Sequence, residues 1–319
     1  MSNGIRSVVT RFRGYQLGIA GSSFSYFADG SFTLIEAMTT DLSKPQLLGE
    51  LHTCGKTTIN TLHITSWDQD HCSAPSLEWI LEKLAPSRIE TPGYVPYTDS
   101  GKTCSAMIRD YRVKWSMKGI NVTTQAIDPP YIKTLGTAEA LGYQEILYHP
   151  RELREKANDN STIKFFRAGA FNVLSLGDVE DPAIAAMLKR CNTICREVDV
   201  LILAHHGADN GFTTKNLLEK LRPRIAVCSS NYDNQFTHPR QEIRDLLYQQ
   251  DIPLYTTKTG DIVMQSVGGH TMDYQVTNLI SDSNKVSSTK GFRSRKSDLL
   301  RMNRDSIRNF LSPGFKGLR

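Results

Sequence analysis

HITSWDQDHCSA, residues 63–74, is the most informative stretch of this sequence, because an apolar strand ends there in a cluster of polar side chains. Asp68, Asp70 and His71 place three potential metal ligands within four positions. Two carboxylates so close together repel each other unless a cation lies between them, so an empty cluster at a strand end is unfavourable. The stretch indicates a metal site, although a solvated turn before the helix SLEWILEKL (residues 76–84) also explains it.

Three further polar clusters follow, two at the end of an apolar strand and one at the start of a helix. They are Asp178 in LSLGDVED, the pair His205 and His206 in LILAHHG, and His238 in FTHPR at the start of a helix. Taken singly, each has an ordinary explanation as a turn residue, a core and surface pair of histidines, or a helix cap. In a covered α/β sheet, however, strand ends converge on one crevice, which is the usual place for a site. Together the clusters predict a metal centre.

Short apolar runs alternate with amphipathic helical stretches, which predicts an α/β fold with a largely covered sheet. The expected strands lie at residues 25–38, 58–67, 88–94, 161–169, 170–178, 198–207, 224–230, 252–257 and 261–267. The expected helices lie at residues 76–84, 106–117, 181–197, 213–221 and 238–250. The third of these begins with Asp181 and Pro182, a typical helix start. Since no Gly/Ser-rich linker interrupts this pattern, we expect residues 1–270 to form one domain.

The composition is that of an ordinary globular protein, with 319 residues of which 39% are hydrophobic and 22% are charged. The sequence contains no apolar run of about 18 residues and no secretory leader pattern, so we expect a cytoplasmic protein without a membrane partner. Six cysteines are too thinly spread for a disulfide scaffold. Cys191 and Cys195 have no second Cys/His pair beside them, so we expect them to pack in a buried helix.

Basic residues concentrate at the C-terminal end. Residues 281–319 contain ten Lys or Arg against three Asp, a net charge of +7 in a chain whose total is +5. We expect residues 271–319 to form a basic, largely disordered tail in which residues 299–311, LLRMNRDSIRNFL, form a short helix. Such a tail can bind nucleic acid by counterion release. A solubilising tail, or one that docks a protein partner, explains the charge as well.

In their order and context, the motifs resemble those of the metallo-β-lactamase superfamily, whose signature is HxHxDH, a downstream Asp at a strand end, and a His before Gly. They are most similar to the hydrolase domain of ComEC-type DNA-uptake proteins, whose first motif reads roughly HxDxDH where this chain has SWDQDH. The resemblance extends from about residue 30 to residue 265 and includes the segments ANDNSTIKFF, AHHG and THPRQEI. It implies a four-layer αββα sandwich.

The resemblance also implies roles for particular residues. It places Asp68, Asp70 and His71 in the first metal-binding motif, Asp178 as the bridging aspartate, and His206 as the His-Gly ligand. It places four further residues near the site, with catalytic, ligand or substrate-binding roles: His205, Asn160, Ser161 and His238. The chain departs from the family at Ser66, where the family has His, and at Glu36, where the family has an Asp-Gly-rich strand end. Because a serine hydroxyl is a poor ligand, we expect one metal position to be weak, vacant or completed by another group.

An oxygen-rich ligand set favours two Mn²⁺ or Mg²⁺ ions, with Zn²⁺ as an alternative. Two such ions clamp the attacking and leaving oxygens of a phosphodiester and make a metal-bound hydroxide the nucleophile. In this scheme Asp70 orients or deprotonates the water. His205 or His238 contacts the phosphate or protonates the leaving oxygen.

We therefore predict a metal-dependent phosphodiesterase, and in the first place a nuclease that acts on DNA rather than RNA. One alternative is a phosphodiesterase for a small signalling nucleotide. Another is a metal-free descendant that binds nucleic acid or a protein partner, against which the retained ligand residues argue. No Gly-rich phosphate loop, GxSxG elbow or kinase motif offers a competing catalytic motif.

Overall fold

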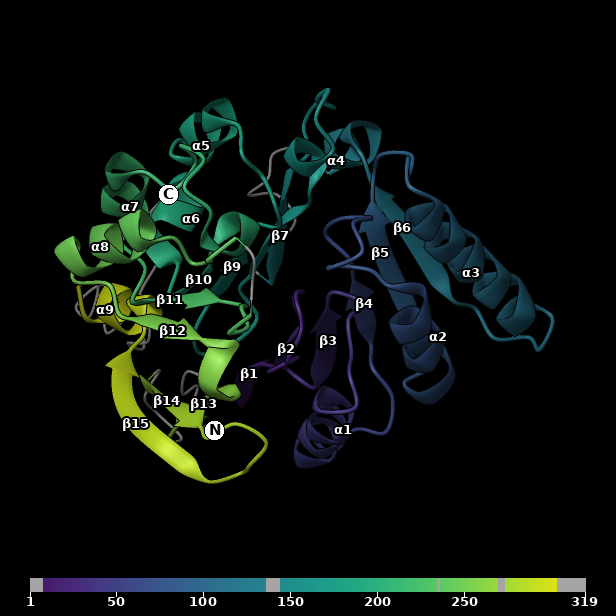
Figure 1. Ribbon diagram of the computed structural model, residues 1–319, viewed down its shortest axis with the longest axis horizontal. Helices are drawn as coiled ribbons and strands as arrows, with labels where there is room; N and C mark the ends of the chain where they lie inside the picture. The colour runs from purple at the N-terminus through teal and green to yellow at the C-terminus, as the bar shows by residue number, and fades with distance from the viewer. Residues whose placement is uncertain (1–7, 136–143, 234–235, 269–272, 303–319) are drawn as a thin grey trace, which may run out of the picture.

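The computed structural model describes residues 8–135, 144–233, 236–268 and 273–302. Two β-sheets pack face to face, and helices cover the outer face of each sheet (Figure 1). The α/β class and the four-layer αββα sandwich predicted from the sequence are confirmed.

The first sheet contains nine strands, of which β3 to β6 run parallel and the others pair antiparallel. In spatial order they are β15 (Val286–Arg293), β14 (Asp273–Leu279), β13 (Ile262–Val267), β1 (Thr10–Gly14), β2 (Phe24–Ala28), β3 (Ser31–Ile35), β4 (Thr61–His63), β5 (Arg88–Pro92) and β6 (Thr123–Ile127). The outer face of this sheet packs against three helices: α1 (Ser43–Thr53), α2 (Ala74–Lys83) and α3 (Asp99–Ser116).

The second sheet contains six strands, of which β9 to β12 run parallel. In spatial order they are β12 (Leu254–Thr256), β11 (Ile225–Cys228), β10 (Val200–Ile202), β9 (Val173–Ser175), β8 (Ile163–Phe166) and β7 (Glu145–His149). Its outer face is covered by α5 (Pro182–Leu188), α6 (Asn192–Glu197), α7 (Lys215–Leu221) and α8 (Gln241–Gln249). A short helix, α4 (Pro129–Thr134), packs beside β6 and β7. Across the described ranges, no helix is both long and apolar enough to span a membrane.

Side chains alternate between the two faces of a strand, and this explains how one strand contributes to two cores. In β10, Val200 and Ile202 point into the core between the sheets, whereas Leu201 points into the core beneath the helices. Successive side chains of a strand leave opposite faces, so a strand buried on both faces reads as a continuous apolar run. The loops that follow β4, β9 and β10 carry the predicted ligands, and they meet at one edge of the sandwich.

Residues 181–197, predicted as one helix, form the two helices α5 and α6. The start is as predicted, because the side chain of Asp181 accepts a hydrogen bond from the backbone of Ala183 at 2.7 Å. The first helix ends at Leu188, and Cys191 has extended dihedral angles before the second begins. This turn lets both helices bury apolar side chains in the same core, where Cys191 and Cys195 also pack, as predicted.

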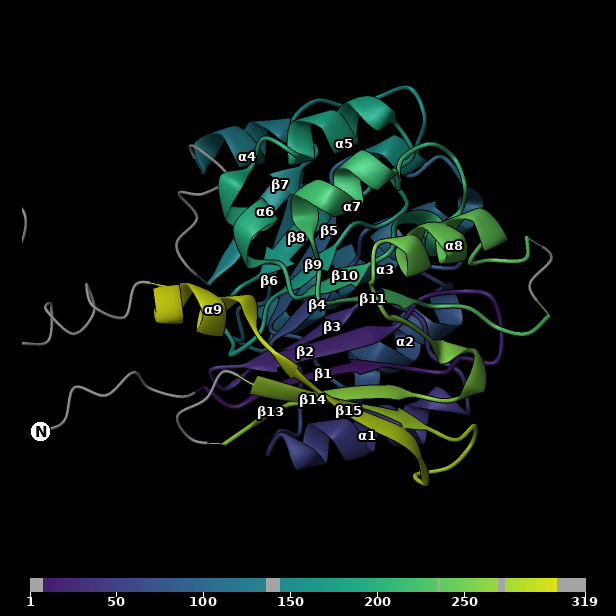
Figure 2. The same cartoon turned by 90° about the vertical axis from the view of Figure 1, so that its left-hand side faces the viewer.

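The structure corrects the expectation of a largely disordered segment from residue 271. Strands β14 and β15 pair along the edge of the first sheet, and α9 (Arg295–Met302) follows them and contacts α6 (Figure 2). The segment is ordered because its polar residues have partners in the fold: Asp199 accepts from the backbone of Arg295 at 2.7 Å, and Lys296 Nζ donates to the carbonyl of Gly169 at 2.7 Å. The remainder of the predicted tail and of its helix, residues 303–319, lies outside the described residues.

Candidate metal centre

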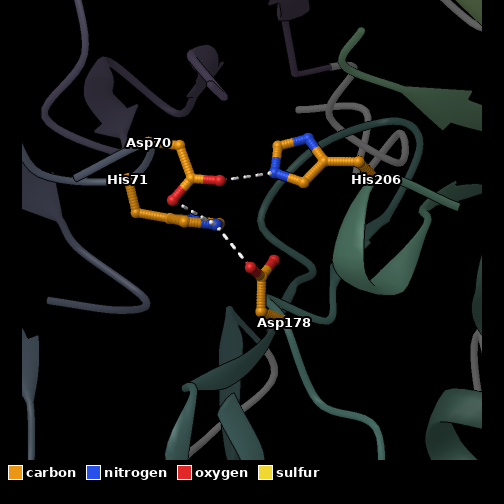
Figure 3. A group of neighbouring side chains, drawn as sticks. All are labelled: Asp70, His71, Asp178 and His206. Atoms are coloured by element: carbon orange, nitrogen blue, oxygen red, sulfur yellow. Dashed lines mark ion pairs between the residues drawn. The ribbon is translucent and has the colours of Figure 1, made fainter. Parts of the chain in front are cut away.

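Four ligand-type side chains converge at the edge of the sandwich (Figure 3). Asp70 and His71 follow β4, Asp178 follows β9, and His206 follows β10. One ligand atom from each residue lies within 4.8 Å of the others. His71 Nε2 is 2.9 Å from Asp178 Oδ2, and His206 Nε2 is 3.3 Å from Asp70 Oδ2. The structure thus brings together four of the five residues predicted as metal ligands.

Glu36, at the end of β3, fixes the orientation of His71. The Glu36 carboxylate accepts hydrogen bonds from the backbone N–H and the hydroxyl of Thr65, at 2.9 and 2.5 Å. His71 Nδ1 lies 3.3 Å from that hydroxyl and 3.2 Å from Glu36 Oε1. These oxygens can accept the proton on Nδ1, and Nε2 is directed at the cluster. Glu36 has a φ of 72°, a left-handed conformation that a non-glycine residue adopts at a cost and that is frequent at functional sites.

The backbone after β10 is also left-handed, with φ of 47° at His205 and 52° at His206. His206 Nδ1 is 3.1 Å from the carbonyl oxygen of Ser229, which can accept its proton. This contact leaves His206 Nε2 facing Asp70, so both histidines have their outer nitrogen engaged and their inner nitrogen presented to the cluster.

A glycine is required beside Asp178. Gly177 has a φ of 58°, and a Cβ placed on it would lie 2.7 Å from the Cβ of the buried Ser161. Ser161, predicted to bind substrate, thus packs against the turn that presents Asp178.

The charges of the cluster stabilise one another. Burial alone would lower the pKa of His71, but the carboxylates of Asp178 and Glu36 raise it well above its usual range. Burial would raise the pKa of Asp178, but the His71 imidazolium lowers it. The pKa of Asp70 is lowered in the same way by His71 and His206, against the effect of burial. The buried Asp178 and the partly exposed Asp70 therefore both keep their negative charge, and a cation is favoured between them.

The donor set fits one divalent cation. The Nε2 atoms of His71 and His206 are buried and have no hydrogen bond of acceptable geometry, although carboxylate oxygens lie near both. Two imidazole nitrogens and two carboxylate oxygens at this spacing are ligands for Mn²⁺ or Zn²⁺. The oxygen partners on the outer nitrogens are typical of metal-binding histidines.

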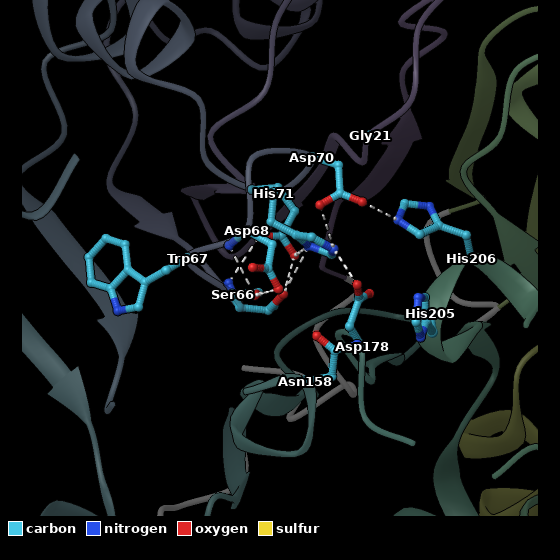
Figure 4. Close-up of polar contacts among 12 residues, drawn as sticks. Gly21, Ser66, Trp67, Asp68, Asp70, His71, Asn158, Asp178, His205 and His206 are labelled. Carbon is cyan, nitrogen blue, oxygen red and sulfur yellow. Dashed lines mark hydrogen bonds and ion pairs between the residues drawn. The ribbon is translucent and has the colours of Figure 1, made fainter. Parts of the chain in front are cut away.

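Asp68 and Ser66 belong to a separate hydrogen-bonded group (Figure 4). Asp68 accepts hydrogen bonds from the hydroxyls of Ser66, at 3.0 Å, and Tyr97, at 2.9 Å. Ser66 Oγ is 3.1 Å from the hydroxyl of Tyr94. Burial and the Asp68 carboxylate raise the pKa of Tyr97 to about 12, so its hydroxyl stays protonated and continues to donate. The structure does not bring Asp68 into the four-residue cluster.

His205 and His238 lie beside the cluster. His205 Nδ1 is 2.7 Å from Glu180, whose carboxylate also accepts from Asn158 Nδ2 at 3.0 Å. The His238 ring lies 6.4 Å from the His206 ring and nearly parallel to it, and 5.8 Å from the His205 ring. Burial and the charges of His206 and His205 lower the pKa of His238 to about 4, so this ring is neutral at neutral pH.

Asn160, the other residue predicted to bind substrate, uses its amide within its own loop. Asn160 Oδ1 accepts from the backbone N–H of Arg154 at 2.7 Å, and Nδ2 donates to the carbonyls of Arg154 and Lys156 at 2.9 and 3.2 Å. These contacts order the loop that lies next to Glu180, where Lys156 Nζ is 3.7 Å from the Glu180 carboxylate.

Sequence reasoning missed Tyr94, Tyr97 and Glu180 as neighbours of the site. The two tyrosines lie in GYVPY, residues 93–97, which contains none of the side chains usual in metal binding. Glu180 had a visible signal, because LSLGDVED contains three carboxylates after one strand.

No protein-family model matches the sequence. Among curated proteins, ComE operon protein 3 of Bacillus subtilis (strain 168) is 27% identical over 100 residues, a match that covers 31% of this chain and 12% of that protein. The chain therefore corresponds to a small part of this relative.

Three solved structures illustrate the structural similarity. Igni18, a metallo hydrolase from Ignicoccus hospitalis KIN4/I, is 14% identical, with a TM-score of 0.45 over 79% of this chain and 98% of that one. Tm1679, a metal-dependent hydrolase of the β-lactamase superfamily, is 12% identical, with a TM-score of 0.47 over 79% and 98%. The metallo-β-lactamase fold protein YhfI from Bacillus subtilis is 10% identical, with a TM-score of 0.44 over 81% and 100%.

Proposed function

We propose that this chain is a metal-dependent phosphodiesterase of the metallo-β-lactamase superfamily, in which Asp70, His71, Asp178 and His206 bind one divalent cation. The observation that carries the proposal is the convergence of these four side chains, with both imidazole Nε2 atoms buried and directed at two ionised carboxylates. A second ion, expected from the sequence, stays a prediction, because Asp68 is engaged with Ser66 and Tyr97. With Asp68 outside the ligand set, Mn²⁺ and Zn²⁺ suit the donors better than Mg²⁺ does.

The residues of the chain divide the remaining work. When bound, the ion supplies Lewis acidity and lowers the pKa of a water molecule. Asp70, whose side chain is 38% exposed, is the ligand that reaches solvent and can orient an attacking water. We assign proton delivery to the leaving oxygen to His205, whose Nδ1 faces the Glu180 carboxylate. His238, neutral at neutral pH, serves as a hydrogen-bonding group for a phosphoryl oxygen.

DNA is the first substrate that we propose. The resemblance of the motifs to the ComEC-type hydrolase and the partial similarity to ComE operon protein 3 support it. A small nucleotide is the second candidate, and one observation favours it: Arg295 and Lys296, part of the C-terminal basic charge, donate hydrogen bonds to carbonyl oxygens of the fold. These two basic side chains therefore have hydrogen-bond partners within the protein and are less available to bind DNA phosphates.

The test is hydrolysis by metal-depleted protein to which Mn²⁺ or Zn²⁺ is returned. Single-stranded DNA, double-stranded DNA and a cyclic dinucleotide serve as substrates, and Asp70→Ala is compared with Asp99→Asn, which changes an exposed carboxylate on α3. We expect metal-dependent cleavage that Asp70→Ala abolishes and Asp99→Asn leaves unchanged. Cleavage by Asp70→Ala at the rate of the wild type would refute the proposed centre.

Deletion of residues 303–319 separates the two substrates. This segment carries four basic residues, Arg304, Arg308, Lys316 and Arg319, and one acid, Asp305. If DNA is the substrate, the deletion makes the affinity less dependent on salt. The magnitude of the slope of log affinity against log salt concentration falls by up to about 0.9 for each phosphate that the deleted side chains had neutralised. An unchanged slope with intact cleavage of the dinucleotide would favour the small substrate.

A further inference from the structure

The crevice beside the metal cluster has an apolar side that the proposed chemistry does not use. This side is a small cleft with a volume of about 50 Å³, well below the range for pockets that enclose a ligand, so it can hold only a part of one. Its walls include Gly21, Asp70, His206, Ser229, Phe236 and His238. The cleft therefore connects two of the proposed ligands to the aromatic ring of Phe236.

Three rings lie almost parallel along this wall. The Phe236 ring is 5.6 Å from the His238 ring with an angle of 24° between their planes, and the His238 ring is 6.4 Å from the His206 ring with an angle of 10°. Phe236 remains 59% exposed, although a phenyl ring normally gains free energy by burial. An exposed ring with its plane set by a neighbouring ring is suited to stacking on a flat substituent of a ligand.

The backbone of Phe236 is also held in place. The guanidinium of Arg240 donates to the carbonyl of Phe236 at 3.2 Å and to the hydroxyl of Thr237 at 2.8 Å. This arrangement brings a positive charge to the backbone of the residue that carries the exposed ring, and a ring with a nearby positive charge suits a nucleotide, which joins a flat base to a negatively charged phosphate.

We propose that Phe236 is a stacking platform for the nucleobase next to the phosphodiester that is cleaved. The inference rests on the proposed function, because the metal cluster marks where the phosphate lies. Stacking is tolerant of base identity, since every base has a π face. The platform therefore selects nucleotides as a class rather than a particular sequence.

The experiment compares two fluorescein-labelled pentanucleotides that differ only in one abasic position. Binding is measured by anisotropy in EDTA, so that the result does not depend on metal or on hydrolysis. We expect the wild type to bind the complete oligonucleotide about tenfold more tightly than the abasic one. Phe236→Ala and Phe236→Leu abolish this preference, whereas Phe236→Tyr retains it. Tyr248→Ala, which removes an exposed ring from α8 that does not line the cleft, behaves like the wild type.

Equal affinity of the wild type for the two oligonucleotides, no binding of either, or an unchanged preference in Phe236→Ala would overturn the platform. Loss of the preference in Phe236→Leu separates stacking from apolar contact, because leucine keeps the apolar side chain without the ring. Cleavage assays with Mn²⁺ distinguish this failure from failure of the proposed function. If the protein cuts neither oligonucleotide but still binds the complete one more tightly, the proposed hydrolase activity is refuted and the stacking platform is supported.

Discussion

The two ends of the segment SWDQDH meet different environments, although they are separated by only a few residues. Asp70 and His71 lie close to Asp178 and His206, which follow strands of the second sheet. Ser66 and Asp68 instead form hydrogen bonds with Tyr94 and Tyr97, from the loop that follows β5. In the metallo-β-lactamase signature that this segment resembles, both ends carry ligands.

The comparison shows that ligand identity depends on what the neighbouring strands supply. At the cluster, the segments after β9 and β10 add a carboxylate and an imidazole, so charges are compensated by a shared cation or by protons. At the other end, the loop after β5 adds two hydroxyls, which satisfy the Asp68 carboxylate by hydrogen bonding. A carboxylate satisfied in this way has less need of a metal ion.

Removal of one carboxylate from each group tests the comparison most directly. Asp178→Asn is expected to lower metal-dependent hydrolysis by more than about 100-fold, because it removes a ligand rather than a group behind one. Asp68→Asn keeps an oxygen that can accept from Tyr97, and we expect a change of less than about tenfold. Steady-state kinetics at saturating Mn²⁺, with circular dichroism to check folding, measures both. Equal losses in the two variants would mean that Asp68 binds metal after all.

Glu36→Gln tests the support behind the cluster. The neutral amide no longer holds the proton on His71 Nδ1 as firmly, so we expect metal affinity to fall by about 10- to 100-fold. Isothermal titration with Mn²⁺ measures the change, and Asp99→Asn is the matched control on the surface. An affinity equal to that of the wild type would show that Thr65 alone orients the ring.

Acid should loosen the Asp178 side of the site through His149. This histidine is buried, its Nε2 lies 2.6 Å from the carbonyl of Asp159, and the Asp159 carboxylate accepts from the backbone of Glu180. Burial lowers the pKa of His149 from 6.5 to about 4. Since the folded protein disfavours the charged ring, its contribution to stability is present above pH 6.5 and is lost as the pH falls towards 4.

Urea unfolding at pH 7 and pH 4 measures this effect. We expect the wild type to lose on the order of 3 kcal/mol more than His149→Gln, which keeps a hydrogen-bond donor but does not titrate. If both proteins lose the same free energy, groups other than His149 control the acid sensitivity.

The smallest effect is expected from restoring a ligand at Ser66. The double variant Ser66→His with Tyr97→Phe supplies an imidazole and removes one hydrogen bond from Asp68. We expect a second, weak binding event for Mn²⁺, seen as a rise from one towards two ions per chain in equilibrium dialysis. A ratio that stays at one would show that the rest of the second position is missing too.

Local pattern in the chain is enough to predict the fold class and the four residues of the cluster. Asp178 and His206 follow strands with continuous apolar runs, which require cover on both faces, and Asp70 and His71 follow the strand expected at residues 58–67. The convergence of the four side chains at the strand ends is therefore predictable. That β14 and β15 are ordered is not predictable from the sequence. The polar residues 281–296 become ordered by pairing with a sheet edge and through partners such as Asp199. The separation of Asp68 from the cluster is equally hidden in the sequence. It depends on tyrosines about thirty residues away, and the packing of distant segments determines which side chains reach a given carboxylate.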